Sequence, residues 1–180
     1  SDVCSSDLSL NLIQANALDI DNVAELIFSR KLLSIEYFLS LPVEQVNILC
    51  KNNITQLMLE DILSIKRAIS LTEKEINVLN VYNIGRLIVR NYLSLDKALS
   101  LNLIQANALD IYNVAELIFS RKLLSIEDFL SLPVEQVNIL CKNNITQLML
   151  EDILSIKRAI SLTEKEINRS EEHTSELQSY

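Results

Sequence analysis

The chain has 180 residues, 49% of them hydrophobic, and a formal net charge of −8. It contains one Gly, one His and no Trp. This composition excludes glycine-rich phosphate loops and two-histidine metal sites, and it argues against a Ser-His-Asp triad and against an all-β fold built on glycine turns. The sequence therefore predicts no cofactor, no metal site and no enzymatic activity.

The two ends differ from the chain between them. Residues 1–8 read SDVCSSDL and residues 169–180 read RSEEHTSELQSY. They resemble the in-frame translations of a common sequencing adapter and its reverse complement, so we interpret both as adapter-derived and exclude them from fold reasoning. They carry five of the 24 acidic and one of the 16 basic residues, which leaves a net charge of −4 on 9–168. We expect the natural protein to extend past both ends.

The middle of the chain repeats on two scales. Residues 9–77 and 100–168 are one segment that differs at only two positions, Asp21 against Tyr112 and Tyr37 against Asp128. This is either a true duplication or an assembly error. Within it, a repeat of about 30 residues aligns on Leu-Ser-Leu. Its units are 8–38, 39–68, 69–98, 99–129 and 130–159, with a partial sixth at 160–168, and we assign the extra residue of the first and fourth units to 29–33 and 120–124.

Each unit predicts short helices in a fixed order. Capping boxes open the first helix at Thr72/Glu75 and Thr163/Glu166, with Asn11/Gln14 and Asn102/Gln105 as variants, and Pro42 and Pro133 stand at the same place. One repeat position predicts the N-cap of the second helix: Asn22, Asn53, Asn83, Asn113 and Asn144. A serine begins the third: Ser34, Ser64, Ser94, Ser125 and Ser155.

Helices this short need neighbours to bury their apolar faces. Apolar residues recur at three- and four-residue steps, as at Ile84, Leu87 and Ile88. The sequence therefore predicts an all-α fold, an α-solenoid of five repeats of two to three short helices plus a partial sixth.

A second asparagine recurs within the first helix, at Asn16, Asn47, Asn77, Asn107, Asn138 and Asn168. These asparagines either form a row of side chains that faces a ligand or make hydrogen bonds to backbone groups of a loop or neighbouring helix. The second interpretation is favoured because a residue that does not vary cannot discriminate between partners.

The turn between the first and second helices varies among the units. Variable loops on a constant scaffold are where repeat proteins place recognition, although unconstrained drift would give the same pattern. The candidate partner-binding residues are Asp19, Asp21, Lys51, Asn52, Tyr82, Asp110, Tyr112, Lys142 and Asn143.

Other reactive or charged residues favour structural roles. Glu60-Asp61, Glu127-Asp128 and Glu151-Asp152 are typical of solvated helix ends, and no histidine is placed to activate Cys50 or Cys141. The equivalent cysteines favour a reducing compartment over a disulfide framework. Lys51, Lys66 and Arg67 with their copies Lys142, Lys157 and Arg158 form either ordinary surface charge or a basic stripe. No apolar run reaches the ~18 residues of a transmembrane helix.

The motifs ISLTEKEIN (69–77), NIGRLI (83–88) and LSLDKAL (93–99) resemble leucine-rich helical repeats of large interaction and effector proteins in amoeba-associated intracellular bacteria. That resemblance implies a scaffold for protein partners.

A rival resemblance starts from LPVEQV (41–46) with Asn52, Asn53 and Gln56, which is similar to the TAL-effector DNA-binding repeat. The mitochondrial termination factor repeat is similar in length and leucine content. Both imply a nucleic-acid partner, but the TAL turn needs a glycine that Gly85 does not supply, and a net negative chain disfavours a phosphate backbone.

We therefore expect a non-enzymatic scaffold for protein–protein interaction, with a nucleic-acid-binding helical array as the alternative. A solenoid without polar capping repeats exposes apolar edges, so we also expect self-association through the uncapped ends.

Overall fold

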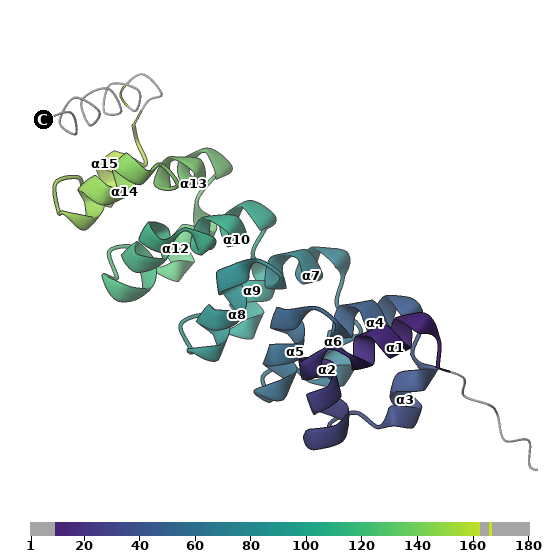
Figure 1. The fold of residues 1–180 in the computed structure, drawn as a ribbon. Coiled ribbons are helices and arrows are strands. Elements are labelled where there is room, and N and C mark those ends of the chain that lie inside the picture. Colours follow the sequence, from purple (N-terminus) through teal and green to yellow (C-terminus); the bar gives the residue numbers. More distant parts are fainter. Residues whose placement is uncertain (1–9, 163–165, 167–180) are drawn as a thin grey trace, which may run out of the picture. The chain divides into compact units, whose positions relative to one another are not determined.

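The structure is a computed structural model that describes residues 10–162 and Glu166 (Figure 1). Every regular element in these residues is helical, which confirms the predicted all-α class. The adapter-like ends lie outside the described residues. The chain divides into two compact units between Leu99 and Ser100, so the two long copies, 9–77 and 100–168, belong to different units.

The first unit contains three successive groups of three short helices. The first group is α1 (Leu12–Leu18), α2 (Asp21–Ala24) with the π-helical turn η1 (Glu25–Ser29), and α3 (Ile35–Ser40). The second is α4 (Val43–Leu49), α5 (Asn52–Leu59) and α6 (Ile65–Ala68). The third is α7 (Glu73–Leu79), α8 (Tyr82–Val89) and α9 (Leu95–Ser100), whose last residue crosses the division.

The second unit contains two such groups in the described residues. The first is α10 (Leu103–Asp110), α11 (Tyr112–Ala115) with the π-helical turn η2 (Glu116–Ser120), and α12 (Ile126–Ser131). The second is α13 (Val134–Leu140), α14 (Asn143–Leu150) and α15 (Ile156–Ala159). Each group has its three helices in the order expected for one repeat, although α3, α9 and α12 run two residues past the predicted ends of their units.

Side-chain caps define where the first and third helices begin. Asn11/Gln14, Thr72/Glu75 and Asn102/Gln105 form the predicted capping boxes at α1, α7 and α10. Pro42 and Pro133 are the N-cap residues of α4 and α13. The predicted serines accept hydrogen bonds at the starts of α3, α6, α9, α12 and α15. Thr163 lies outside the described residues.

The prediction that Asn22, Asn53, Asn83, Asn113 and Asn144 cap the second helices is wrong. These helices begin one residue before each asparagine, and their N-cap residues are Ile20, Lys51, Val81, Ile111 and Lys142, which make no side-chain cap hydrogen bond. The physical reason is competition from the next repeat. Asn53, for example, uses its Nδ2 to donate to the carbonyls of Leu79 and Val81, at 2.8 and 3.1 Å.

The extra residue of the first and fourth units lies earlier than predicted. The N–H of Arg30 donates to the carbonyl of Glu25, and that of Arg121 to the carbonyl of Glu116, which are the five-residue spacings of a π-turn. After each second helix one residue has positive φ: Lys31, Asp61, Asn91, Lys122 and Asp152. Two residues lie between this residue and the capping serine in every unit. The extra residue therefore precedes the positive-φ residue and is accommodated within the helix.

Packing joins equivalent helices of consecutive groups. In the first unit α1 packs on α4, α2 on α5 and α5 on α8 (Figure 1), and in the second α10 packs on α13 and α11 on α14. The second helices contribute more buried hydrophobic residues than the first or the third helices do, as in α5, where Ile54, Leu57 and Met58 are at most 1% exposed. Full burial of each such side chain contributes about 1.5–3 kcal/mol, so the fold depends mainly on contacts between groups.

Candidate interaction surface

The nine predicted partner-binding residues lie in or next to the turns between first and second helices. Asp19, Lys51 and Lys142 lie in the turns, Asp110 is the last residue of α10, and the other five are the first residues of second helices: Asp21, Asn52, Tyr82, Tyr112 and Asn143. Eight are exposed and Asp110 is half-buried. The turns are short because two residues separate each first helix from the second at α1–α2, α4–α5 and α7–α8. Tyr82 and Tyr112 expose 68% and 76% of their surface. Large aromatic rings held in water are typical anchors of protein interfaces, so these turns offer contact area as well as charge.

Hydrogen bonds between asparagines bring neighbouring turns together within each unit. Asn22 Nδ2 donates to Asn52 Oδ1 at 2.6 Å in the first unit, and Asn113 Nδ2 donates to Asn143 Oδ1 at 2.7 Å in the second. Both pairs join residues that are 30 apart in sequence. The candidate residues of consecutive repeats therefore lie side by side, at α2–α5 and at α11–α14.

The turns differ chemically on this constant frame. Asp19 and Asp21 are acidic, Lys51 and Asn52 are basic and polar, and Tyr82 is aromatic with the Arg86 guanidinium 5.9 Å from its ring centroid. Such a cation–π contact contributes about 0.5–1 kcal/mol at an exposed site and orients the tyrosine ring. The three turns of the first unit therefore present different groups to solvent, whereas Lys142 and Asn143 in the second unit repeat Lys51 and Asn52.

The second asparagine series forms an exposed set next to these turns. Asn16, Asn47 and Asn77 in the first unit, with Asn107 and Asn138 in the second, are all exposed, and no side-chain amide among them makes a hydrogen bond within the described residues. The favoured interpretation, that they satisfy backbone groups, is therefore wrong. The sixth member, Asn168, lies outside the described residues. An asparagine costs up to about 0.7 kcal/mol of helix propensity relative to alanine, and no side-chain hydrogen bond within 10–162 offsets that cost.

The hydrogen bonds between neighbouring repeats are made by different asparagines from those that the sequence predicts. The prediction was that the asparagines equivalent to Asn16 bond to backbone groups and that those equivalent to Asn22 cap a helix. Asn53 in fact bonds to backbone carbonyls of the next repeat, and Asn47 points to solvent without a partner. The apolar periodicity contained a usable signal, because Asn47 follows buried Val46 on the outer side of α4 whereas Asn53 precedes buried Ile54 and Thr55 at the start of the most buried helix.

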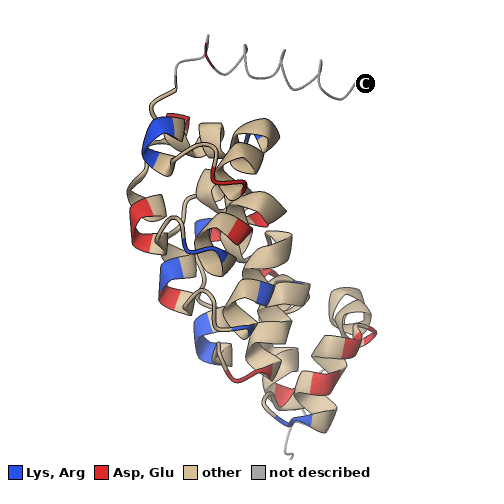
Figure 2. Cartoon of the chain, turned by 90° about the vertical axis from the view of Figure 1, so that its left-hand side faces the viewer, with Lys and Arg blue, Asp and Glu red and all other residues tan. Residues whose placement is uncertain are grey.

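The basic residues do not form a continuous stripe along the third helices of the first unit. Glu36 on α3 is followed by Lys66 and Arg67 on α6 and then by Asp96 and Lys97 on α9. Figure 2 shows acidic and basic segments interleaved. Positive and negative charges therefore alternate in this row.

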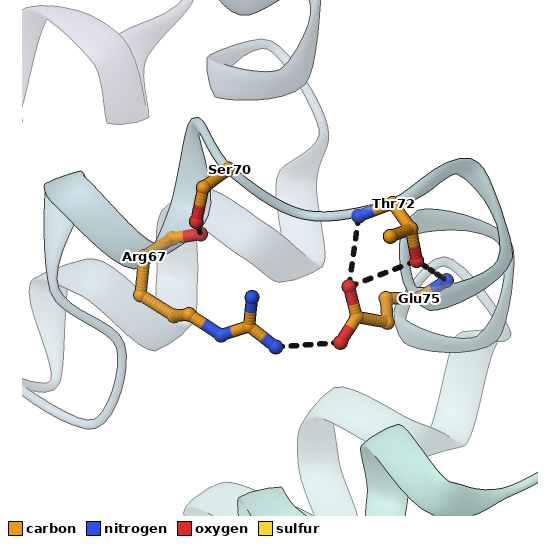
Figure 3. Close-up of polar contacts among 4 residues, drawn as sticks. All are labelled: Arg67, Ser70, Thr72 and Glu75. Atoms are coloured by element: carbon orange, nitrogen blue, oxygen red, sulfur yellow. Dashed lines mark hydrogen bonds and ion pairs between the residues drawn. The ribbon is translucent and has the colours of Figure 1, made fainter.

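An acidic partner neutralises each arginine of the pairs Lys66-Arg67 and Lys157-Arg158. Arg67 Nη2 lies 2.5 Å from Glu75 Oε1 (Figure 3), and Arg158 Nη2 lies 2.5 Å from Glu166 Oε1. The Thr72 backbone N–H is the main cause that lowers the pKa of Glu75, and the Thr72 hydroxyl and Arg67 lower it further. This network ties α6 to the start of α7 and leaves less positive charge for a phosphate backbone.

The cysteines and acidic pairs present no activated nucleophile or metal cluster in the described part of the chain. Cys50 and Cys141 are half-buried free thiols, and burial raises the pKa of each, with Lys51 partly opposing this at Cys50. The acidic pairs are exposed, as predicted. Within 10–162 and Glu166 no three His, Cys, Asp or Glu residues gather in a way that could hold a metal ion. Nor does any described helix have the length and apolarity to cross a membrane.

Comparison with known proteins gives no relative from which a function could be transferred. No protein-family model, curated protein or solved structure matches this chain.

Proposed function

We propose that the five helical groups form one α-solenoid, and that this solenoid is a non-enzymatic scaffold that binds a protein partner through the turns between first and second helices. The observation that carries the proposal is the contrast between a constant frame and variable exposed turns. Capping boxes, serine caps and asparagine ties recur, whereas the turns carry Asp21, Asn52 and Tyr82 at one equivalent position.

Packing between equivalent helices supports the solenoid. Helices α2, α5 and α8 succeed one another in contact within the first unit, and α11 and α14 do so in the second. A helix pair that packs only on its sequence neighbours is the building principle of solenoid repeats. The same stacking sets the turns in a row, which is the geometry a partner spanning several repeats requires.

Charge favours protein over nucleic acid as the partner. The turns of the first unit combine Asp19 and Asp21 with Lys51, and the arginine of α6 is paired with Glu75. A protein that follows a phosphate backbone needs a net basic surface, because affinity comes from neutralised phosphates and released counterions. Mixed charge suits a protein partner, since complementary pairs of both signs give specificity and orientation.

The test is a selection of random phage-displayed peptides against the full chain, in parallel with a variant in which all nine candidate turn residues are alanine. We expect peptides that bind the natural chain and lose binding to the variant. The matched control replaces four exposed third-helix residues, Glu36, Tyr37, Lys66 and Lys157, by alanine and should keep binding. Enriched peptides that bind the nine-residue variant equally well would refute the assignment of the turns.

A salt-dependent gel shift on the full chain separates the two partner classes. We expect no shift of double-stranded DNA or single-stranded RNA at low salt. A shift that weakens steeply with added salt would overturn the protein-partner proposal.

A further inference from the structure

We propose that the first unit binds an extended peptide segment in polyproline II conformation across α1 and α4, with a basic and an acidic residue three positions apart in the peptide. This inference rests on the proposed function and names the class of partner. It starts from two exposed amides, Asn16 on α1 and Asn47 on α4, two helices that pack against each other (Figure 1), and from two exposed charges in the turns that follow them, Asp19 and Lys51.

Each charge lies just beyond the C-terminal end of the helix that carries an exposed amide. Asp19 is the C-cap of α1, three residues after Asn16, and Lys51 lies two residues after the end of α4. In the described residues neither amide has a hydrogen-bond partner, and neither Asp19 nor Lys51 forms an ion pair. All four groups are therefore free to contact a ligand.

An asparagine amide matches a peptide backbone. Its NH₂ donates and its oxygen accepts, which are the two functions of a backbone amide. A polyproline II segment has no internal hydrogen bonds, so its carbonyls remain available to such donors. A contact of this kind recognises the peptide backbone rather than a side chain, so the same residue type can serve on both α1 and α4 while the adjacent turns differ.

The spacing of the helices selects the conformation. Packed helices lie about 8–10 Å apart. Polyproline II has three residues per turn and a rise of about 3.1 Å, so residues three apart point the same way at a distance of about 9 Å. In a β-strand, side chains on one face repeat every two residues, at about 6.6 Å, which does not match the helix spacing.

The charges select the peptide's side chains. The carboxylate of Asp19, near Asn16, would pair with a basic residue of the peptide. The ammonium of Lys51, near Asn47, would pair with an acidic residue three positions away in the peptide. In the second unit Asn107 on α10 and Asn138 on α13 repeat the two exposed amides, whereas Asp110 is half-buried and both Asp110 and Lys142 have partners in the fold. Because the amides recur, the experiment alters them in both copies.

The probes are two fluorescent peptides with blocked ends, PPKPPEPP and PPEPPKPP, titrated with the full chain by fluorescence polarisation. We expect one orientation to bind, and the neutral peptide PPQPPQPP to bind about tenfold more weakly. The variant N16A/N47A/N107A/N138A should lose about tenfold in affinity. The matched control N77A removes the same exposed amide outside α1 and α4 and should bind as the natural chain does.

Loss of fold does not confound this test, since alanine has a higher helix propensity than asparagine and the four amides make no described contact. The urea midpoint of the quadruple variant should equal or exceed that of the natural chain. The inference is overturned if the charged peptide binds the quadruple variant as tightly as it binds N77A. It is also overturned if neither charged peptide binds the natural chain at a chain concentration of about 1 mM. If random selection still yields turn-dependent binders in that case, the proposed function stands and only the peptide class is wrong.

Discussion

The only glycine of the chain is expected to control the asparagine tie between the second and third repeats. Gly85 lies in the interior of α8 with ordinary helical φ, where glycine costs about 0.8–1.0 kcal/mol relative to alanine. A Cβ added there would lie 3.1 Å from Asn53 Cγ and 3.2 Å from its Cβ and Oδ1. Asn53 is held in that position by its two bonds to Leu79 and Val81, so it cannot retreat without weakening them.

The free energies of these interactions determine whether each substitution stabilises or destabilises the fold. Each of the two hydrogen bonds contributes about 0.5–1.5 kcal/mol, so Asn53→Ala should cost about 1–3 kcal/mol. Gly85→Ala in the natural chain gains about 1 kcal/mol of propensity and loses a similar or larger amount from Asn53, so it should be neutral to destabilising. In the Asn53→Ala background the close contacts with Cγ and Oδ1 are gone and only the 3.2 Å contact with Cβ remains, so Gly85→Ala should stabilise by up to about 1 kcal/mol.

The assay is a double-mutant cycle by urea unfolding, followed by circular dichroism at 222 nm. The coupling between positions 53 and 85 should be about 1–2 kcal/mol. Gly85→Ala that stabilises the natural chain by the full propensity gain would refute the reasoning, because Asn53 would then tolerate the added methyl group without cost.

Three further predictions concern charge, reactivity and backbone. Because the folded chain lowers the pKa of Glu75 below 4.5, its carboxylate stabilises the fold above the unfolded-state pKa and this stabilisation is lost as pH falls through the lower folded value. The difference in urea midpoint between the natural chain and Glu75→Gln should therefore shrink below about pH 4, and a constant difference from pH 7 to pH 3 would contradict this. In a Cys4→Ser background, Cys50 and Cys141 should react with Ellman's reagent more slowly than glutathione does at pH 7 and faster as pH rises, since burial raises both pKa values; fast reaction at neutral pH would refute their protonated state. Asp61→Gly should stabilise by roughly 0.5–1 kcal/mol because Asp61 has φ 57°, whereas Glu60→Gly, at a residue with negative φ, should destabilise; thermal unfolding of the pair checks the sign.

Local signals in the sequence predicted the helices well. Thr72 with Glu75 and Asn11 with Gln14 are complete capping boxes, because a cap depends only on residues within one turn of the helix. The serine caps were predictable for the same reason. The exposure of the variable turns followed from the periodicity of the apolar residues around them.

Contacts between repeats were harder to predict because they depend on residues about 30 positions away. Asn53 resembles an N-cap in its local sequence, but the carbonyls of Leu79 and Val81 attract its amide. The same limitation affected Asn47, which has no partner once the helices are packed. The insertion in the first unit was placed too late because a π-turn at Glu25–Ser29 leaves no gap in the apolar pattern.

A hydrogen-exchange footprint of the chain with a selected peptide bound tests directly whether the turns bind the partner. Protection should increase at residues 19–22, 51–53 and 81–83 and at their copies in the second unit, with little change on the third helices. Protection confined to α3, α6, α9, α12 and α15, with unchanged exchange at the turns, would contradict binding at the turns.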